Sequence, residues 1–450
     1  MDHTILERYG DMRLPRYTSY PTAPKFSAAV GTGTYRDWLA GLDEAERVSL
    51  YLHVPFCRSM CWYCGCHTTI TQKDQPILDY LDVLKREMTL VAEAVAKKPK
   101  VASVHFGGGT PTIMKPEEFL DLVAHMSGHF ELDAETELAV EIDPRTLEAG
   151  MIEALGAANV TRASLGVQSF DPKVQKAINR IQSAEQTRDA TEGLRAAGVR
   201  SVNFDLIYGL PHQTVTSVIE TAETAIAMKP DRFAVFGYAH VPSFKKHQRL
   251  IDENALGDAT ERHAQAEAIA ETLVRAGYRR IGLDHFALPD DGLTIAAAKG
   301  TLHRNFQGYT TDSCETLIGF GASAIGRFRH GYVQNDVAIG RYAQAIASGE
   351  LATAKGYRLT AEDQLRADII ERVMCDFRVD LRTLCDRHGF GIDTLVQGNG
   401  RLKRLLDDGI VALSAGVLSV RSEERFLVRA IAACFDAYLD DTGRIHSKAA

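Results

Sequence analysis

The stretch that decides the fold runs from Cys57 to Cys66 and reads CRSMCWYCGC. It places Cys57, Cys61 and Cys64 at C-x3-C-x2-C spacing, just after an apolar segment, 49–54, that is typical of a β-strand. Cysteine thiolates are the protein ligands of iron–sulfur clusters, and a cubane cluster needs four ligands. Three closely spaced cysteines would leave one iron open to a reactant, so the spacing predicts a reactive 4Fe-4S cluster.

Two other roles for these cysteines stay open. Cys66 adds a fourth cysteine and His67 follows it, which would complete a zinc site, although structural zinc sites usually pair two ligand clusters across a longer loop. A disulfide is disfavoured, because the chain has only eight cysteines in 450 residues and shows no signal-peptide pattern. We therefore expect a cytoplasmic, reducing setting. The remaining cysteines are spread singly and are expected to be buried thiols: Cys314, Cys375, Cys385 and Cys434.

The composition predicts a soluble enzyme of two or three domains. Hydrophobic residues make up 45% and charged residues 24% of the chain, which are ordinary values. No apolar run approaches the roughly 20 residues of a membrane span. The net charge of −8 argues against a nucleic-acid binder, which needs clustered Lys and Arg. We therefore expect neither a nucleic acid nor a membrane as a partner, and an anionic substrate would need a local basic pocket.

From residue 49 to about 283, short β-branched runs alternate with amphipathic segments of helical length, which is typical of parallel strands joined by right-handed crossovers. The expected strands are 50–54, 101–106, 137–142, 162–167, 201–207, 232–238 and 278–283. The expected helices include 76–96, 116–127, 184–197 and 215–228. We predict an α/β fold, a partial (βα) barrel, in which ligands gather at the carboxyl ends of the strands.

Polar or glycine residues follow several of these strands. The string GGGTP at 107–111 closes one strand, and its glycines let the backbone approach a ligand and expose its amides. Glu141, Gln168 and Asp205 close three others. Such residues are often only helix caps or turn formers, and no P-loop ending follows GGGTP. Five successive strand ends of this kind instead predict a ligand site, where carboxylates and amides would hold ribose hydroxyls and an adenine edge.

These strings carry two resemblances. The cysteine triad followed by GGGTP is similar to the radical S-adenosylmethionine (SAM) superfamily, in which SAM binds the open iron and is cleaved to a 5′-deoxyadenosyl radical. With CWYCGC, VHFGGGTPT, VEIDP, LGVQSFD, INRIQ, FDLIYGLP and PRYTSYPTA, nearly the entire chain resembles the oxygen-independent coproporphyrinogen III oxidases. Haem-chaperone-like relatives typically lack both the fourth cysteine and the PRYTSYP leader, and this chain has both.

The resemblance implies a function. The implied reaction is oxidative decarboxylation of two propionates of coproporphyrinogen III to vinyl groups, which gives protoporphyrinogen IX in haem synthesis. The implied cofactors are a 4Fe-4S cluster and two molecules of SAM, with a reducing electron donor of flavodoxin or ferredoxin type. We expect a monomer. A haem-binding or haem-delivering relative, or a radical SAM enzyme acting on another tetrapyrrole, is the alternative.

The resemblance also assigns site residues. The cluster ligands would be Cys57, Cys61 and Cys64. The first SAM would be held by Tyr51, Tyr63, Gly108 and Glu141. The second SAM would be held by Gly109, Thr110, Gln168, Arg180, Asp205, Ala239 and Ile325. Relatives often carry phenylalanine at the position of Tyr63, and without the family Ala239 and Ile325 would be interpreted as strand-end packing.

Three regions are expected along the chain: a substrate-contacting leader, 1–48, the radical SAM barrel domain, 49–355, and a smaller, mainly helical, winged-helix-like cap, 356–450. The cap would consist of helices 360–377, 380–388 and 393–408 and a hairpin, 409–420. It is expected to lie over the open side of the barrel.

Two basic clusters are candidates for substrate contact. In the leader, Arg13 and Arg16 suit carboxylates, and Tyr17 or Tyr20 suits a tetrapyrrole face, although terminal segments are often merely packed or disordered. The second cluster is equally consistent with a solvated helix face: Lys245, Lys246, His247 and Arg249.

Overall fold

The structure, a computed structural model, describes residues 5, 8–10 and 12–439. Its largest element is a curved sheet, in which twelve strands are hydrogen-bonded within the described residues. In sheet order they are β16 (Thr353–Arg358), β15 (Gly331–Asn335), β14 (Ile325–Phe328), β13 (Leu317–Phe320), β1 (Arg47–Val54), β4 (Lys100–Gly108), β5 (Glu137–Ile142), β6 (Arg162–Gln168), β7 (Ser201–Tyr208), β8 (Arg232–Gly237), β10 (His285–Ala287) and β9 (Arg279–Ile281).

The middle of the sheet is parallel. Seven adjacent strands, from β13 through β1 to β8, pair in parallel within the described chain. The first six expected strands are confirmed as β1 and β4 to β8, with small differences at their ends. The outermost strands of the described sheet, β16 and β9, do not pair with each other. The prediction of a partial barrel is therefore confirmed.

Both edges of the sheet are antiparallel, and here one prediction is wrong. The segment 278–283 does not form a further parallel strand: it contains β9, which pairs antiparallel with β10, and β10 pairs antiparallel with β8. Gly282, just after β9, has a φ of +56°, and a Cβ there would lie 2.0 Å from the ring of Tyr309. Since only glycine fits there, the chain reverses at this point and the parallel order ends. At the other edge, β14, β15 and β16 form an antiparallel meander.

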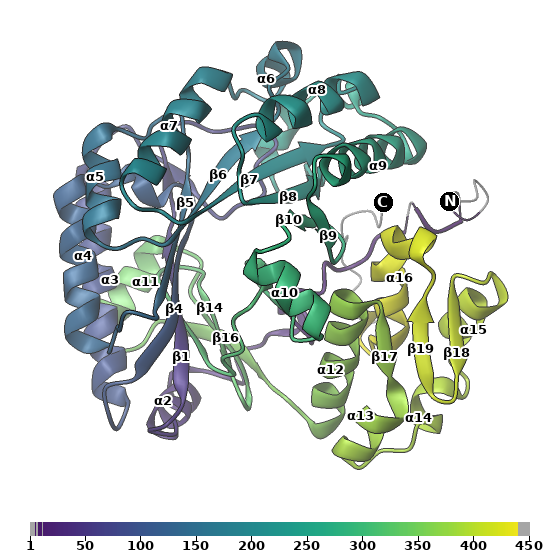
Figure 1. Cartoon of the computed structure of the whole chain (residues 1–450). Helices are drawn as coiled ribbons and strands as arrows, with labels where there is room; N and C mark the ends of the chain where they lie inside the picture. The colour runs from purple at the N-terminus through teal and green to yellow at the C-terminus, as the bar shows by residue number, and fades with distance from the viewer. Residues whose placement is uncertain (1–4, 6–7, 11, 440–450) are drawn as a thin grey trace.

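Helices cover the outer face of the sheet (Figure 1). Their bounds are α2 (Thr32–Ala40), α3 (Gln75–Ala94), α4 (Pro116–His129), α5 (Ala149–Ala157), α7 (Ala184–Ala196), α8 (Val215–Ile226), α9 (Ala259–Arg275) and α11 (Ile339–Ala347). Two further helices lie elsewhere: α6 (Pro172–Ala177) follows the end of β6, and α10 (Gly292–Lys299) packs between β9 and α12 (Ala361–Asp376). The predicted helices 76–96, 116–127, 184–197 and 215–228 are confirmed as α3, α4, α7 and α8. Side-chain caps fix several starts, as at α7, where Ser183 accepts a hydrogen bond from the amide of Gln186 at 3.0 Å.

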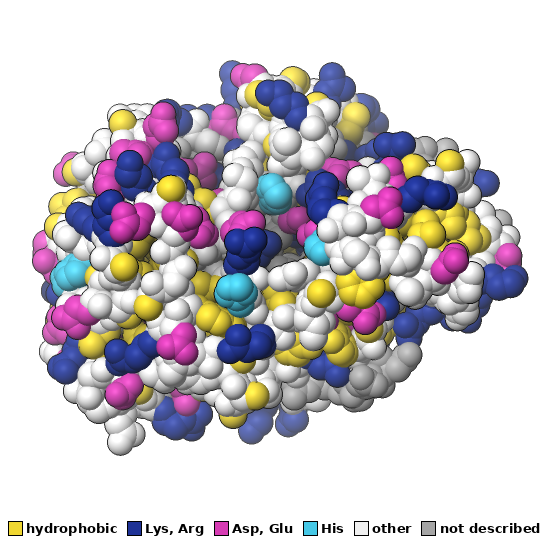
Figure 2. Space-filling model, turned by 90° about the horizontal axis from the view of Figure 1, so that it is seen from below, with side chains coloured by type: hydrophobic (Ala, Val, Ile, Leu, Met, Phe, Trp, Pro, Cys, Tyr) yellow, Lys and Arg dark blue, Asp and Glu magenta, His cyan; other side chains and the backbone are white. Residues whose placement is uncertain are grey.

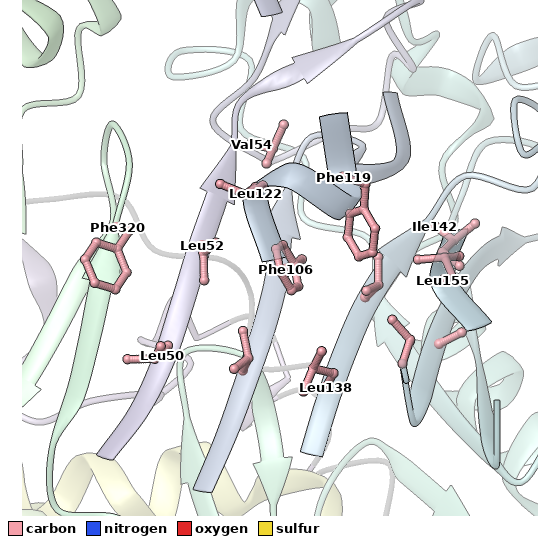
Figure 3. Close-up of a cluster of buried hydrophobic side chains, with 14 of the residues drawn as sticks. Leu50, Leu52, Val54, Phe106, Phe119, Leu122, Leu138, Ile142, Leu155 and Phe320 are labelled. Atoms are coloured by element: carbon pink, nitrogen blue, oxygen red, sulfur yellow. The ribbon is translucent and has the colours of Figure 1, made fainter. Parts of the chain in front are cut away.

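The core joins the sheet to these helices (Figure 3). Leu50, Leu52 and Val54 alternate along β1, are fully buried, and lie on the side that faces Phe119 and Leu122 of α4. Because successive side chains of a strand point to opposite faces, the residues between them point into the barrel. The apolar alternation of β1 therefore also decides which residues reach the barrel interior.

The C-terminal part has its own core. Its helices are α12 (Ala361–Asp376), α13 (Leu381–His388), α14 (Asp393–Val396), α15 (Gly400–Asp407) and α16 (Val428–Ala432), and its sheet consists of β17 (Arg378–Asp380), β19 (Val417–Val420) and β18 (Val411–Ser414). The hairpin expected at 409–420 is confirmed. The single helix expected at 393–408 is wrong, because Gly398 has a φ of +72° and Asn399 caps a new helix at the amide of Leu402. β16 crosses the expected boundary at 355/356.

The leader packs on this C-terminal core. Tyr9, Leu14, Tyr17 and Tyr20 are buried members of it. The hydroxyl of Tyr17 donates to Asp436 at 3.0 Å, and the hydroxyl of Tyr20 accepts from the amide of residue 437 at 3.0 Å. The start of the chain and its last described segment are thus held together.

Charges of both signs share the surface. On the face shown in Figure 2, Lys and Arg side chains are interspersed with Asp and Glu. Among the described residues, no helix has both the length and the apolar character that crossing a membrane requires.

Candidate active site

A cavity of about 710 Å³ lies at the carboxyl ends of the parallel strands. Residues from the carboxyl-terminal halves of β4, β5, β6, β7 and β8 and from the segments after β1, β4, β5 and β8 line it, together with 14–16 of the leader. Twelve of the fourteen predicted site residues lie on its wall: Cys57, Cys61, Cys64, Tyr63, Gly108, Gly109, Thr110, Glu141, Gln168, Arg180, Asp205 and Ala239. Tyr51 and Ile325 do not line it.

The cysteine loop begins where β1 ends. Cys57 lies in the short strand β2 (Phe56–Cys57), which pairs in parallel with β3 (Thr69–Ile70) and so closes the base of the loop. The Sγ of Cys57 lies 3.4 Å from the hydroxyl of Thr110 and 3.4 Å from that of Thr68. The loop is therefore fastened to the glycine segment that follows β4.

Cations contact the second cysteine. The guanidinium groups of Arg145 and Arg180 lie 3.5 Å and 3.6 Å from the Sγ of Cys61. Cationic hydrogen-bond donors complement the negative charge of sulfur that is bound to iron. The donor set at this thiol therefore fits an iron–sulfur cluster.

The third and fourth cysteines differ in acidity. Hydrogen bonding from Cys66 lowers the pKa of Cys64 below its usual value, and the charges of His247 and Lys245 lower it further. The same hydrogen bond, made to Cys64, raises the pKa of Cys66. Burial raises the pKa of Cys57. Of these two thiols, Cys64 therefore forms the metal-binding thiolate more readily than Cys66.

The three thiols line one cavity without converging on a point. Within the described residues, no three His, Cys, Asp or Glu side chains are placed to hold a single metal ion.

The glycine segment is hydrogen-bonded to the backbone at the end of β1 and just after it. The amide of Gly109 donates to the carbonyl of Val54 at 2.9 Å, and that of Thr110 donates to Phe56 at 2.8 Å. A Cβ at Gly109 would lie 2.5 Å from the carbonyl oxygen of Phe56, so glycine is required there. The expectation that this segment exposes its amides is wrong, since these amides are already bonded.

Glu141 connects two neighbouring strand ends. Its carboxylate accepts a hydrogen bond from the amide of Gly108 at 3.2 Å and lies 3.1 Å from Nε2 of His105. The ring of Tyr51 packs beside it, because both side chains lie 3.0 Å from the position a Cβ of Gly107 would take. Tyr51 thus supports the site from behind Glu141, although it does not line the cavity.

Asp143 is a site residue that the sequence analysis missed. Arg145 donates to it at 2.6 Å and Arg180 at 3.2 Å. Burial alone would raise the pKa of Asp143, but these two arginines hold it below its usual value. The signal was present in the string VEIDP, because Glu141 and Asp143 are two positions apart in extended chain and point the same way.

The carboxylate of Asp205 has few hydrogen-bond partners among the described residues. Its carboxylate accepts from the amide group of Asn203 at 2.8 Å and from the hydroxyl of Ser164 at 3.2 Å. Burial, followed by the charge of Glu141, raises the pKa of Asp205 to about 7. The carboxyl can therefore take up or release a proton near neutral pH.

Gln168 has spare hydrogen-bonding capacity next to these groups. Its backbone adopts a left-handed conformation, with φ of +66°. Its side-chain Oε1 is buried and has no hydrogen-bond partner among the described residues. An unpaired buried acceptor at a cavity wall is explained by a ligand that donates to it.

The remaining predicted residues differ in their placement. Tyr63 packs with Ile178 and Tyr238 on the cavity wall. The carbonyl of Ala239 accepts from Gln248 at 3.2 Å. Ile325 begins β14, beside Gly319 of β13, so it is next to the strand that pairs with β1 and away from the wall.

The two basic clusters are placed differently. Arg16 lines the cavity and is exposed to it, whereas Arg13 is exposed and is not part of the lining. Tyr17 and Tyr20 do not line this cavity either, because they pack on the C-terminal core. In the second cluster, Lys245 donates to the carbonyl of Cys66 at 2.8 Å and His247 lies 2.7 Å from that of Cys64.

Comparison with known proteins agrees with this geometry. The model of the radical SAM superfamily matches residues 51–225. The chain is 58% identical over 441 residues to the oxygen-independent coproporphyrinogen III oxidase of Bradyrhizobium diazoefficiens, with 98% of each chain covered. It is 39% identical over 452 residues to that of Pseudomonas aeruginosa, covering 98% of this chain and 97% of the relative.

A solved structure shows the same fold. The coproporphyrinogen III oxidase from Escherichia coli, described as a radical SAM enzyme, superposes with a TM-score of 0.91 and 35% sequence identity, over 97% of this chain and 99% of that one. The relatives are matched almost from end to end, so the likeness extends beyond the cysteine loop. The chain belongs to the oxygen-independent coproporphyrinogen III oxidases, a family of radical SAM enzymes.

Proposed function

We propose that the protein converts two propionates of coproporphyrinogen III to vinyl groups and so forms protoporphyrinogen IX. The observation that supports this most is one cavity that gathers the cysteine triad, the polar ends of the parallel strands and a leader cation, Arg16. Each conversion breaks one C–H bond and one C–C bond, releases CO₂ and passes one electron to an acceptor. The C–H bond is unactivated, so a side-chain base cannot break it and a radical is needed.

The proposed cofactors are a 4Fe-4S cluster and SAM, which when bound supply hydrogen abstraction by a 5′-deoxyadenosyl radical. Cys57, Cys61 and Cys64 would hold the cluster. The guanidinium groups at 3.5 Å and 3.6 Å from the Sγ of Cys61 would stabilise its thiolate.

Two SAM positions are proposed. Glu141, with Gly108, Tyr63 and Tyr51, would hold the molecule next to the cluster, because a carboxylate and backbone carbonyls suit an ammonium group. The second molecule would be held by Gly109, Thr110, Gln168, Arg180, Asp205, Ala239 and Ile325. The buried and unpaired Oε1 of Gln168 supports a ligand there.

An electron donor of flavodoxin or ferredoxin type is proposed to approach over residues 244–250. This segment contacts the cysteine loop, through the 2.8 Å bond from Lys245 to the carbonyl of Cys66. Beside it Lys246 and Arg249 are exposed, and so are Phe244 and Leu250, at 60% and 59%. Cations around apolar side chains suit an acidic carrier protein.

We further propose that the protein acts as a cytoplasmic monomer with the three regions 1–48, 49–355 and 356–450. All eight cysteines are free thiols in the structure, which supports a reducing compartment. The leader reaches the cavity through Arg16, which supports a substrate-contacting role. The region after 356 would act as the cap.

The deciding experiment is an anaerobic assay of the reconstituted protein with coproporphyrinogen III, SAM and dithionite. We expect CO₂, two SAM cleaved per product, and a product lighter by two formic-acid equivalents. SAM cleavage that depends on coproporphyrinogen III but gives neither CO₂ nor a vinyl product would contradict the proposal and favour other tetrapyrrole chemistry.

A further inference from the structure

A second cavity, of about 70 Å³, adjoins the main one. The two share Arg16, Phe236, Gly237 and Tyr238 as lining residues. The lining of the smaller cavity contains one carboxylate, that of Asp284, and five arginines: Arg16, Arg262, Arg280, Arg304 and Arg429. Such a concentration of cations inside a chain of net charge −8 requires an explanation.

Arg304, which lines this cavity, has buried donors without a hydrogen-bond partner. Its side chain is 5% exposed and its guanidinium lies over the ring of Tyr309, 4.5 Å from the centroid. Its Nε and Nη1 make no hydrogen bond within the described residues. Nη1 lies 3.9 Å from Oδ1 of Asp284, which is too far for a hydrogen bond. Buried charged donors are costly unless they are paired, so additional negative charge near this guanidinium would stabilise the arrangement.

Arg16 is held at the junction of the two cavities by its backbone. Arg429 donates from Nε to the carbonyl of Pro15 at 2.9 Å and from Nη2 to that of Leu14. Arg304 donates from Nη2 to the carbonyl of Arg16 at 3.5 Å. Arg16 itself is an exposed residue and lines both cavities.

The carboxylate of Asp284 interacts with more than one neighbouring side chain. Asp284 lies 2.8 Å from Nδ1 of His285, and it is also the negative charge that acts on Arg16. The two terminal nitrogens of Arg280 are paired elsewhere, because Glu267 accepts from them at 3.1 Å and 3.3 Å. Burial, followed by the charge of Arg16, lowers the pKa of Arg429 to about 10. The arginines therefore repel one another, and an anion between them would relieve that repulsion.

We propose that this arginine pocket binds a propionate carboxylate of the tetrapyrrole other than the one being decarboxylated. The assignment of the ligand rests on the proposed function. The volume of about 70 Å³ is roughly that of two water molecules at about 30 Å³ each. It therefore admits a carboxylate with part of its side chain, whereas the pyrrole rings stay in the main cavity.

The test uses the reconstituted holoenzyme and two stable probes, coproporphyrin III and its tetramethyl ester, whose binding is followed by fluorescence. We expect Arg304→Gln to weaken binding of the tetracarboxylate tenfold or more, Arg304→Lys to restore part of it, and both to leave binding of the ester unchanged. Arg16→Gln should act in the same direction, and it guards against a folding defect at the buried Arg304. Arg279→Gln, an exposed arginine of β9, is the matched control and should change neither affinity.

Equal loss for acid and ester would overturn the proposal, because it would reveal a general packing role. Unchanged affinity for the acid in both Arg304→Gln and Arg16→Gln would overturn it as well. The proposed function is judged separately, by vinyl product from the unaltered enzyme. The variants could lose binding of the acid selectively while the unaltered enzyme forms no vinyl product. That result would support carboxylate binding in the arginine pocket and contradict the proposed reaction.

Discussion

The Nη1 of Arg180 lies 3.6 Å from the Sγ of Cys61. Arg180 follows α6, far from the cysteine loop in sequence, and the same guanidinium donates to the carbonyl of Gly166 at 2.6 Å and to Asp143. One side chain thus joins the proposed cluster ligand to the ends of β5 and β6. The proposed cluster and the proposed second SAM position therefore share a cation.

The first prediction concerns the cluster ligands. Replacing Cys57, Cys61 or Cys64 by Ser should abolish the brown, oxygen-sensitive absorbance and SAM cleavage together, because serine is a poor iron ligand. Cys66→Ser is the matched control from the same loop and should retain iron, since its pKa is raised and that of Cys64 is lowered. Loss of iron from Cys66→Ser as complete as from the others would show that the three-ligand assignment is wrong. Iron and sulfide content measure the outcome.

The second prediction separates the two roles of Arg180. Arg180→Gln should lower the SAM stoichiometry from two toward one and shift the cluster potential to a more negative value, because a positive charge near a cluster ligand favours the reduced state. Arg145→Gln removes the other cation beside Cys61 and should shift the potential alone. Equilibrium dialysis and redox titration provide the two readouts. Two SAM molecules still bound to Arg180→Gln would reject its assignment to the second position.

Parts of this architecture could be predicted from sequence, and the reason lies in local rules. The apolar runs of β1 and β4 to β8, and the cap of α7 at Ser183, are encoded by residues close together in the chain. The reversal at Gly282 depends on the ring of Tyr309, which is distant in sequence, so 278–283 was predicted as a further parallel strand.

The arginine pocket could not be predicted from residues close together in the chain either. Its walls come from the leader, the barrel and the C-terminal part, and Arg304 and Arg429 follow no motif. Tyr17 and Tyr20 of the leader were expected to suit a tetrapyrrole face, and the surface on which they pack depends on tertiary structure. They lie against the C-terminal core, where the ring of Tyr20 stacks on that of Tyr438 at 5.9 Å.

The third prediction concerns pH and Asp205. Its folded pKa of about 7 lies above the unfolded value of about 3.9, so the folded state holds the proton more tightly. The stability that this provides is present below about pH 4 and is lost as pH rises through 7. Asp205→Asn should therefore reduce the loss of stability of the cofactor-free protein between pH 5 and 8 in urea unfolding. Asp189→Asn, at an exposed position on α7, should not. An identical pH profile for the parent and Asp205→Asn would contradict the raised pKa.

The fourth prediction tests the approach of the electron donor. Lys246→Glu combined with Arg249→Glu should slow turnover driven by a flavodoxin several-fold, and the rate of the parent should fall with rising salt, because exposed charges act mainly on association. Turnover driven by dithionite should be unchanged, since a small reductant needs no docking surface. Equal loss with both reductants would place the effect in the cysteine loop instead of the surface. Lys173→Glu, an exposed lysine of α6, is the charge-matched control.

The fifth prediction uses the two leader arginines as a matched pair. They are three residues apart, both are exposed, and only Arg16 lines the cavity. A charge-assisted hydrogen bond contributes about 1.5–3 kcal/mol, which corresponds to roughly tenfold or more in affinity. Arg16→Gln should therefore raise the KM for coproporphyrinogen III at least tenfold while the KM for SAM and the iron content stay constant. Arg13→Gln should leave all three quantities unchanged.

These point changes are preferable to deleting the leader through Tyr20, because Tyr17 and Tyr20 are buried in the C-terminal core and their loss would disturb folding. Equal effects of Arg13→Gln and Arg16→Gln would mean that the leader contributes only general charge, and no effect of either would remove it from the substrate site.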